Sequence, residues 1–328
     1  MSDCFLVLAH TERGLSCFLL PRFLPDGTRN RFHVQRLKDK LGNRSNASSE
    51  VEFAGSHAVM LGEDGRGVRT IIDMVHHTRL DCVSGSAGLM RRALSEAMHH
   101  ARHRAAFGKA LAAQPLMQNV LADLALESEA ATALALRLAR AFDAQKDEAE
   151  GLLRRVLTPA AKYWICKRGP AVGAEAMEVL GGNGYVEEGV MARIYRQMPL
   201  NSIWEGSGNI MCLDILRAFG KHPRSLEILS AELSAALGKN KNFDRFVARL
   251  KDSVKDTENI EARARSITQG IALAVQGGLL VRFAPDYVAD AFCASRLAAD
   301  SPFGGGAFGA LPGNTNFGAL LTRAWPEH

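Results

Sequence analysis

The hydrophobic pattern of this 328-residue chain changes its period near residues 62–67, and this change constrains the fold most strongly. Before it, short apolar runs separated by Gly and Pro turn signals are typical of strands. After it, apolar residues recur at helical spacing, so the sequence up to about residue 300 predicts almost nothing but helices. A few strands followed by many long helices predict a mainly α protein with a partial β domain.

Four short strands are expected before the change, at residues 4–10, 15–20, 32–37 and 47–53. The first apolar run begins at Cys4 with no lead-in, so we expect that further sequence precedes it in the complete protein. The polar loop 38–46 is either a solvated connection or a contact with a cofactor or a neighbouring subunit.

Helices are expected over residues 116–144, 152–179, 211–219, 226–237, 243–253, 262–282 and 287–298. The Gly169-Pro170 pair is expected to break the second of them. Long amphipathic helices with short links predict an antiparallel bundle. The Gly-rich run from Ser301 to Gly309 is expected to be flexible.

The composition and the short motifs exclude few classes of protein. The formal net charge of +5 is compatible with an anionic ligand or with nucleic acid, but it is too small to argue for either. The six cysteines lie far apart without a CxxC pair, which favours reduced thiols in a cytoplasmic protein. No apolar run approaches the roughly 20 residues of a membrane-spanning helix, so no membrane association is expected. A serine hydrolase is poorly supported because no GxSxG motif occurs.

Glu205 lies between Trp204 and Gly206, just before an apolar run. One interpretation is an acid in the first turn of a helix, where the helix dipole favours negative charge. The other is a carboxylate base at the mouth of a pocket, where Gly206 and Gly208 let backbone N–H groups approach a ligand. The local sequence leaves both interpretations open.

Two arginines also have alternative interpretations. Arg104 opens a segment that ends at Gln114 and joins one long helix to the next, so it belongs either to an interhelix turn or to a phosphate clamp. Arg79 lies within an otherwise apolar helix. Its guanidinium either pairs with Asp81 or another carboxylate, or it faces a ligand pocket.

Clusters of histidine and of basic residues favour solvated helix faces. His99 and His103 share a helix face, but no acid lies between them and no cysteine is near, so no metal site is expected. The basic residues between 239 and 265 are interleaved with acids, which is typical of a salt-bridged surface rather than of a nucleic-acid stripe.

Three motifs together resemble the acyl-CoA dehydrogenase family, and they occur in the family's order and separations. They are Arg104-x-x-Phe107-Gly108, Leu180-Gly181-Gly182-Asn183-Gly184-Tyr185 and Trp204-Glu205-Gly206-Ser207. Residues 37–48, residues 199–214 and the helical tail beyond 222 are similar to the AidB branch of that family. This branch is a flavoprotein group associated with the adaptive response to DNA alkylation.

The resemblance implies three domains. Residues 1–60 correspond to the end of the middle β domain, residues 61–222 to the FAD-binding C-terminal four-helix bundle, and residues 223–328 to an AidB-like helical extension with a flexible Gly-rich segment. It also implies a homotetramer with FAD at its interfaces. The family's N-terminal helices and early β segment have no counterpart in this sequence, which implies an N-terminally truncated chain.

The resemblance also implies an activity. Glu205 matches the base that removes the α-proton of an acyl-CoA thioester while the flavin of FAD takes the β-hydride. Some relatives place this base at the position of Thr78, where threonine cannot serve. Arg79 matches an arginine near the substrate pocket. The residues implied for FAD binding are Arg104, Phe107, Gln114, Gly181, Gly182 and Ser207.

Two alternatives stay open beside this enzyme. One is an AidB-like flavoprotein that associates with double-stranded DNA and has little dehydrogenase activity. The other is a truncated, non-catalytic bundle that only oligomerises.

Overall fold

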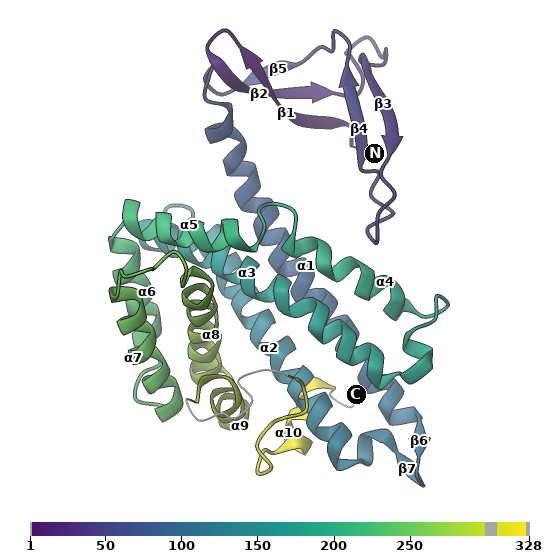
Figure 1. Cartoon of the computed structure of the whole chain (residues 1–328), viewed down its shortest axis with the longest axis vertical. Helices are drawn as coiled ribbons and strands as arrows, with labels where there is room; N and C mark the ends of the chain where they lie inside the picture. Colours follow the sequence, from purple (N-terminus) through teal and green to yellow (C-terminus); the bar gives the residue numbers. More distant parts are fainter. Residues whose placement is uncertain (1, 299–306, 326–328) are drawn as a thin grey trace. The chain divides into compact units, whose positions relative to one another are not determined.

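The computed structural model describes residues 2–298 and 307–325 (Figure 1). Contacts divide the chain into a first unit, Met1–Thr78, and a second unit, Arg79–His328. Most of the Gly-rich run that was expected to be flexible lies outside the described residues. The predicted three-domain division at residues 60 and 222 stays a prediction.

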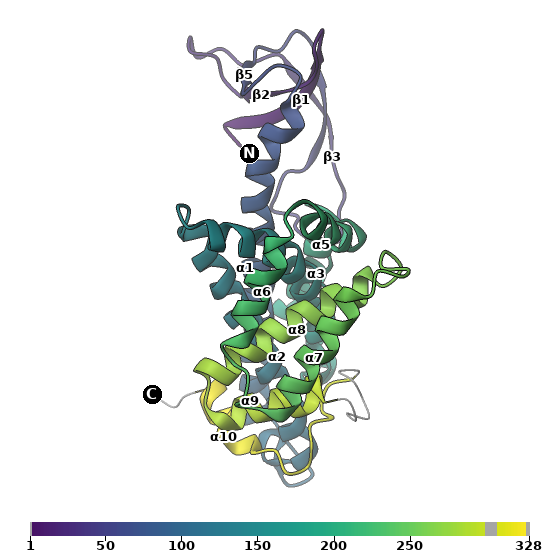
Figure 2. The same cartoon turned by 90° about the vertical axis from the view of Figure 1, so that its left-hand side faces the viewer.

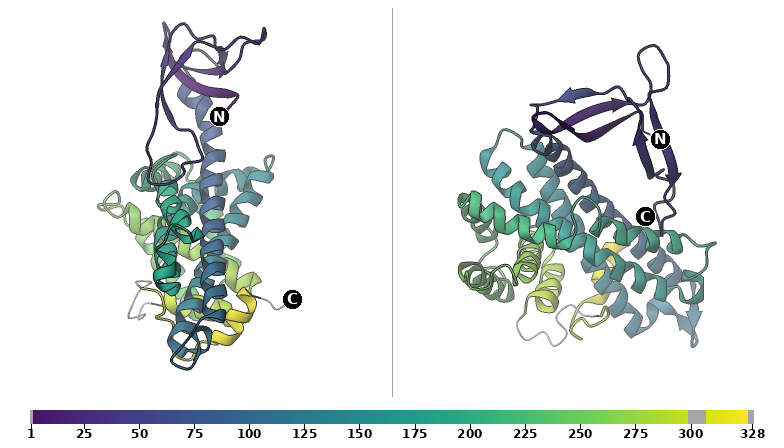
Figure 3. Two further views of the ribbon diagram at one scale, coloured as in Figure 1. Left: turned by 90° about the vertical axis from the view of Figure 1, so that its right-hand side faces the viewer. Right: turned by 45° about the horizontal axis from the view of Figure 1, so that its top comes forward.

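The strands of the first unit form a three-stranded and a two-stranded antiparallel sheet, which can be followed in Figures 1 and 3. One has the order β1-β2-β5 and the other pairs β3 with β4. The strands are β1 (Cys4–Thr11), β2 (Gly14–Pro21), β3 (Phe32–Leu37), β4 (Ser49–Phe53) and β5 (Val59–Leu61). The four expected strands are confirmed, whereas β5 escaped prediction because three residues are too few to show a period.

Hydrogen bonds to Asp64 hold the loop between β5 and α1 against β1 and β2. Its carboxylate accepts hydrogen bonds from Ser16 Oγ (2.7 Å) and Thr11 Oγ1 (2.5 Å), which together hold the pKa of Asp64 below its ordinary value. Helix α1 then begins at Gly67, where a Cβ would lie 2.3 Å from the carbonyl carbon of Ser16. Only glycine therefore allows the helix to start this close to β2.

The second unit is a helical bundle. Its first helices are α1 (Gly67–His103, which begins in the first unit), α2 (Pro115–Asp143), α3 (Glu148–Val179), α4 (Val190–Gln197) and α5 (Gly208–Lys221). The expected break at Gly169-Pro170 is wrong, because α3 continues through Pro170. Proline removes one helical hydrogen bond, but Gly169 and Val172 on either side of it are buried against neighbouring elements, and this packing outweighs the loss.

The helices beyond residue 222 share the hydrophobic core of the bundle. They are α6 (Arg224–Ser234), α7 (Lys241–Lys255), α8 (Ala264–Phe283), α9 (Asp286–Phe292) and α10 (Phe317–Ala324), and a π-helical turn (Cys293–Leu297) follows α9. Helices α6, α7 and α8 lie side by side in Figure 2, and α8 also packs on α2 and α3. Gly277 and Gly278 let Phe243 of α7 approach α8 closely. The expected mainly α fold with a partial β domain is confirmed.

The six cysteines are free thiols, and five of them are buried. Burial raises the pKa of Cys166 and of Cys293 to about 12, and it also raises that of Cys82 and Cys212. Cys4 alone is exposed. Among the described helices, none combines the length and the apolar character that crossing a bilayer requires.

An ion-pair cluster connects α6 and α8 to α2 and α3. Arg137 of α2 donates to Glu150 of α3 (2.8 and 3.0 Å) and to Glu232 of α6 (3.0 Å twice). Arg282 of α8 also donates to Glu232 (3.3 Å). The side chains of Arg137, Glu150 and Glu232 are only 10%, 16% and 14% exposed, so each depends on its partners for compensation.

We expect Glu232→Gln to lower the free energy of unfolding at pH 7 by about 3 kcal/mol, since it breaks a largely buried ion pair. Burial raises the pKa of Glu232, but the hydrogen bonds and charge of Arg137 outweigh this, and the net pKa lies below the ordinary value. Its stabilisation is therefore complete above about pH 4.3 and is lost as pH falls through the folded-state pKa. Urea denaturation at several pH values measures both effects.

Glu148→Gln is the matched control. Glu148 of α3 pairs with Arg224 of α6 at 2.8 Å, but their side chains are 75% and 56% exposed. An exposed ion pair contributes little, so this variant is expected to unfold like the wild type. Equal losses in the two variants, or a loss in Glu232→Gln that does not shrink as the pH falls below the ordinary pKa of a glutamate, would contradict the assigned role of the cluster.

Candidate functional site

Glu205 lies in a turn of unusual backbone conformation. Its φ is +59°, and that of Gly206 is +99°. Helix α5 begins only at Gly208, after the N-cap residue Ser207, so its first turn contains no acid. The interpretation of Glu205 as a first-turn helical acid is therefore wrong, because the chain leaves the helical region three residues before α5. A non-glycine residue in this region costs about 1–3 kcal/mol and persists only where its surroundings impose it.

Arg79 of α1 holds one side of this turn. Its Nε donates to the carbonyl oxygen of Glu205 at 3.0 Å, and its Nη1 lies 3.2 Å from Asp214 Oδ2. The residue is only 6% exposed, and burial lowers the pKa of its guanidinium. Of the alternatives open for Arg79, the structure shows pairing with a carboxylate, but that of Asp214 and not of Asp81.

Asp214 connects three helices. It lies on α5, and besides Arg79 of α1 it accepts hydrogen bonds from Arg155 of α3, at 2.9 and 2.6 Å. Two guanidinium groups thus share one carboxylate that is 13% exposed. This arrangement attaches the middle of α5, the helix that follows the Glu205 turn, to α1 and α3.

Lys162 of α3 holds the other side of the turn. It is 1% exposed, and its Nζ donates to the carbonyl oxygens of Gly206 (2.8 Å) and Asn201 (3.0 Å). Burial lowers the pKa of this ammonium group. Lys162 was not among the predicted site residues, although a lysine in an apolar helical run is the same kind of signal as Arg79.

Asn201 attaches the aromatic neighbour of Glu205 to α1. Its Oδ1 accepts a hydrogen bond from Trp204 Nε1 (3.0 Å), and its Nδ2 donates to Ser86 Oγ (3.0 Å). Asn201 is buried, and so is its hydrogen bond to Ser86, whereas the bond from Trp204 is partly buried. The indole that precedes Glu205 is therefore held in place by a hydrogen-bonded chain that starts on α1.

The Arg104 motif forms a short hairpin between α1 and α2. Strands β6 (Ala105–Ala106) and β7 (Lys109–Ala110) pair, and Phe107 and Gly108 form the turn with φ of +53° and +82°. The Phe107 side chain is 96% exposed, and Arg104 is also exposed. The hairpin, blue in the right-hand view of Figure 3, lies at one end of the unit.

Gln114 ties this hairpin to α2. It is the N-cap residue of α2, and its Nε2 donates to the carbonyl oxygen of Ala106 at 3.1 Å. The expected interhelix turn is thus a β-hairpin with a two-residue turn. The interpretation of Arg104 as part of a phosphate clamp stays a prediction.

The glycine motif forms a 3₁₀ turn (Gly181–Gly184) after α3. Gly181 has φ of +59°, and a Cβ on Gly181 or Gly182 would meet nothing within 4 Å. A Cβ on Gly184 would lie 2.2 Å from the carbonyl oxygen of Met177. Gly184 is therefore needed for the turn itself, whereas the first two glycines leave open space beside the backbone.

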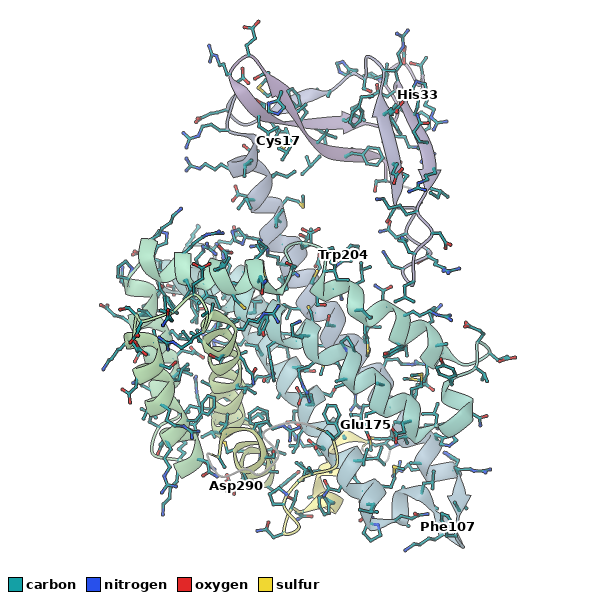
Figure 4. All side chains as sticks on the ribbon, in the orientation of Figure 1. Cys17, His33, Phe107, Glu175, Trp204 and Asp290 are labelled. Carbon is teal, nitrogen blue, oxygen red and sulfur yellow. The ribbon has the colours of Figure 1, made fainter. Side chains whose placement is uncertain are left out.

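The predicted site residues fall into three places on the second unit. Arg79, Glu205 and Ser207 lie together, whereas Arg104, Phe107 and Gln114 lie at the hairpin, and Gly181 and Gly182 lie in the 3₁₀ turn. Figure 4 shows Phe107 and Trp204 far apart on this unit. Within one chain, the structure therefore does not bring the residues implied for FAD binding into one site.

The histidines contact their own helix and its neighbour. His103 Nδ1 lies 2.8 Å from the carbonyl oxygen of His99, and the His99 ring packs on Trp325. Over residues 2–298 and 307–325, no three His, Cys, Asp or Glu side chains are grouped in a way that would hold a metal ion.

Residues 65–220 match the family described as "Acyl-CoA dehydrogenase, C-terminal domain". Over 292 residues the chain is 51% identical to the AidB protein of Escherichia coli (strain K12), a match that covers 89% of this chain and 54% of AidB. The chain spans about half the length of the curated relatives it matches.

Solved structures agree with this match. The crystal structure of Caenorhabditis elegans ACDH-11 in complex with C11-CoA has a TM-score of 0.82 at 28% identity, covering 90% of this chain and 57% of that one. An acyl-CoA dehydrogenase from Bacillus anthracis complexed with FAD has a TM-score of 0.68 at 18% identity, covering 89% and 58%, and this likeness concerns the fold alone. With these matches and with the helical bundle described above, the chain belongs to the acyl-CoA dehydrogenase family.

Proposed function

We propose that this chain provides the catalytic base and part of the FAD site of an acyl-CoA dehydrogenase-type oxidoreductase. The observation that carries the proposal is the turn at Glu205, whose left-handed backbone is held by two buried cations, Arg79 and Lys162. Strained backbone that is fixed from several helices is typical of functional sites. A surface acid without a role would need no such support.

The proposed reaction removes the α-proton of an acyl-CoA thioester. A weakly acidic C–H group requires a carboxylate held at a fixed position, and this is the role of Glu205, whose Oε atoms take the proton. The enolate that develops requires hydrogen-bond donors at the thioester oxygen. By the family resemblance, the backbone N–H of Glu205 is one of them, so the conformation of this turn sets the directions of both base and donor. FAD supplies the acceptor for the β-hydride.

Exposed residues of the hairpin between α1 and α2 and of the 3₁₀ turn after α3 are suited to contact parts of FAD. Arg104 presents a guanidinium fork suited to phosphate oxygens, and the almost fully exposed Phe107 ring presents an apolar face. At Gly181 and Gly182 nothing crowds the backbone, so a ligand can approach it. Because these places are separate within one chain, we propose that neighbouring subunits of a homotetramer combine them around each FAD.

Glu205→Gln is expected to lower acyl-CoA oxidation by at least about 100-fold, since the amide cannot accept the α-proton and general base catalysis contributes 10²–10⁴-fold. FAD content is expected to stay unchanged. The measurement is turnover of acyl-CoA with a dye as electron acceptor, normalised to the FAD absorbance of the purified protein.

Glu188→Gln is the control for this variant, since it makes the same change at an exposed glutamate in the loop before α4. It is expected to turn over like the wild type. Turnover of Glu205→Gln within about tenfold of the wild type would remove Glu205 from the mechanism. A wild type that holds neither FAD nor activity would favour the non-catalytic bundle instead.

Arg104→Gln is expected to weaken FAD binding by about tenfold or more, because a charge-assisted hydrogen bond to phosphate is lost. The measurement is FAD release on dilution, followed by flavin fluorescence. Lys146→Gln removes an exposed cation from the loop between α2 and α3 and is expected to change nothing. Equal FAD retention in both variants would exclude Arg104 as a phosphate ligand.

The 51% identity to AidB keeps a second candidate, a flavoprotein associated with double-stranded DNA. If this candidate holds, duplex DNA binds the purified protein and the affinity falls steeply, by about 10³-fold or more between 50 and 200 mM salt. Fluorescence anisotropy with a labelled duplex measures this. Absent or salt-independent binding would eliminate the candidate while leaving the dehydrogenase proposal intact.

A further inference from the structure

A groove of about 790 Å³ lies between α2, α8 and α10 of the second unit, away from the Glu205 turn. Its floor is apolar and buried, with Ala125, Leu279 and Leu280 at 6%, 6% and 2% exposure. Its walls include Leu136 of α2 and Phe283 of α8, which are 66% and 69% exposed. The volume lies within the range of about 300–1,000 Å³ that is typical of small-molecule sites.

The rim of this groove is rich in arginine. Arg91, Arg137, Arg140 and Arg323 line it together with a single acid, Glu129. Arg323 pairs with Glu129 at 2.9 Å. The charge of Arg137 is balanced in the cluster described above, where Glu150 and Glu232 face Arg137 and Arg282. Two of the four lining arginines are thus neutralised.

The other two keep their charge. Arg91 donates to the carbonyl oxygen of Ala324 (2.7 Å), which is a neutral acceptor. Arg140 is near enough to Glu232 to contribute to lowering its pKa, but Glu232 is already shared by Arg137 and Arg282. Within residues 2–298 and 307–325, neither Arg91 nor Arg140 forms an ion pair of its own. The groove therefore combines an apolar floor with two surplus positive charges.

We propose that this groove binds an amphipathic anion, a carboxylate on an aliphatic chain. The carboxylate pairs with Arg140, which is exposed and lies one helical turn from Leu136. The chain lies on Leu136, Phe283 and the buried floor. Charge complementarity selects an anion over a neutral chain, and the apolar floor selects an aliphatic anion over inorganic phosphate. This site is independent of the proposed FAD and acyl-CoA chemistry.

Calorimetric titration of the purified full chain with decanoate tests the proposal, with decanol as the neutral probe of equal chain length. Decanoate is expected to bind one site, and decanol at least about tenfold more weakly. Arg140→Gln is expected to weaken decanoate about tenfold or more through loss of a charge-assisted hydrogen bond. Leu136→Asp is expected to abolish binding, because it places a negative charge on the wall.

Arg193→Gln is the matched control, since it removes an exposed arginine on α4, outside the groove, and it is expected to bind decanoate like the wild type. Equal affinity of Arg140→Gln and wild type, or equal affinity for decanol and decanoate, would overturn the proposal. So would cosedimentation with anionic phospholipid vesicles in the absence of decanoate binding. A change of oligomeric state in Leu136→Asp with decanoate binding retained would assign the wall to contacts between copies, and it too would overturn the proposal.

Discussion

The conformation of the Glu205 turn depends on two cations that are themselves buried. Arg79 and Lys162 donate to the carbonyl oxygens of Glu205 and Gly206, and they come from α1 and α3. Removing a cation from water costs several kcal/mol, and only well-placed acceptors offset this cost. The left-handed turn presents those carbonyls, while the cations keep the turn in its strained form. Each part therefore stabilises the other, and the conformation of the turn depends on how α1 and α3 pack in the bundle.

The sequence predicted local structure well and long-range pairing poorly. Periodicity located the strands β1 to β4 and the long helices, because those signals lie within a few turns of chain. Lys162 and Asp214 went unnoticed because their partners lie 39 to 135 residues away in sequence. The expected break at Gly169-Pro170 failed for the same reason, since packing from distant helices decided that α3 continues.

The resemblance to the family predicted a role for Glu205 that the local residue patterns left open. Local sequence left Glu205 between a helix-end acid and a base, and only its combination with two distant motifs singled out the second. The structure removes the first interpretation on independent grounds, from backbone angles. Within a single chain, Arg104 and Phe107 lie apart from Gly181, so these residues do not meet around one ligand. Phe107 is exposed in the turn of the hairpin, where its aromatic ring is 96% exposed and buries little area against its own chain, and Arg104 is exposed at the base of the same hairpin.

The burial of five thiols also has a practical consequence. Cys17, Cys82, Cys166, Cys212 and Cys293 lie out of solvent, so a maleimide dye added to the folded protein reacts at Cys4. That residue begins β1 of the first unit, whereas Trp164, Trp204 and Trp325 all belong to the second. A dye on Cys4 therefore places an energy-transfer acceptor on the first unit, while the tryptophan donors lie on the second. Energy transfer from tryptophan to the dye then reports on the distance between the two units without any amino-acid substitution.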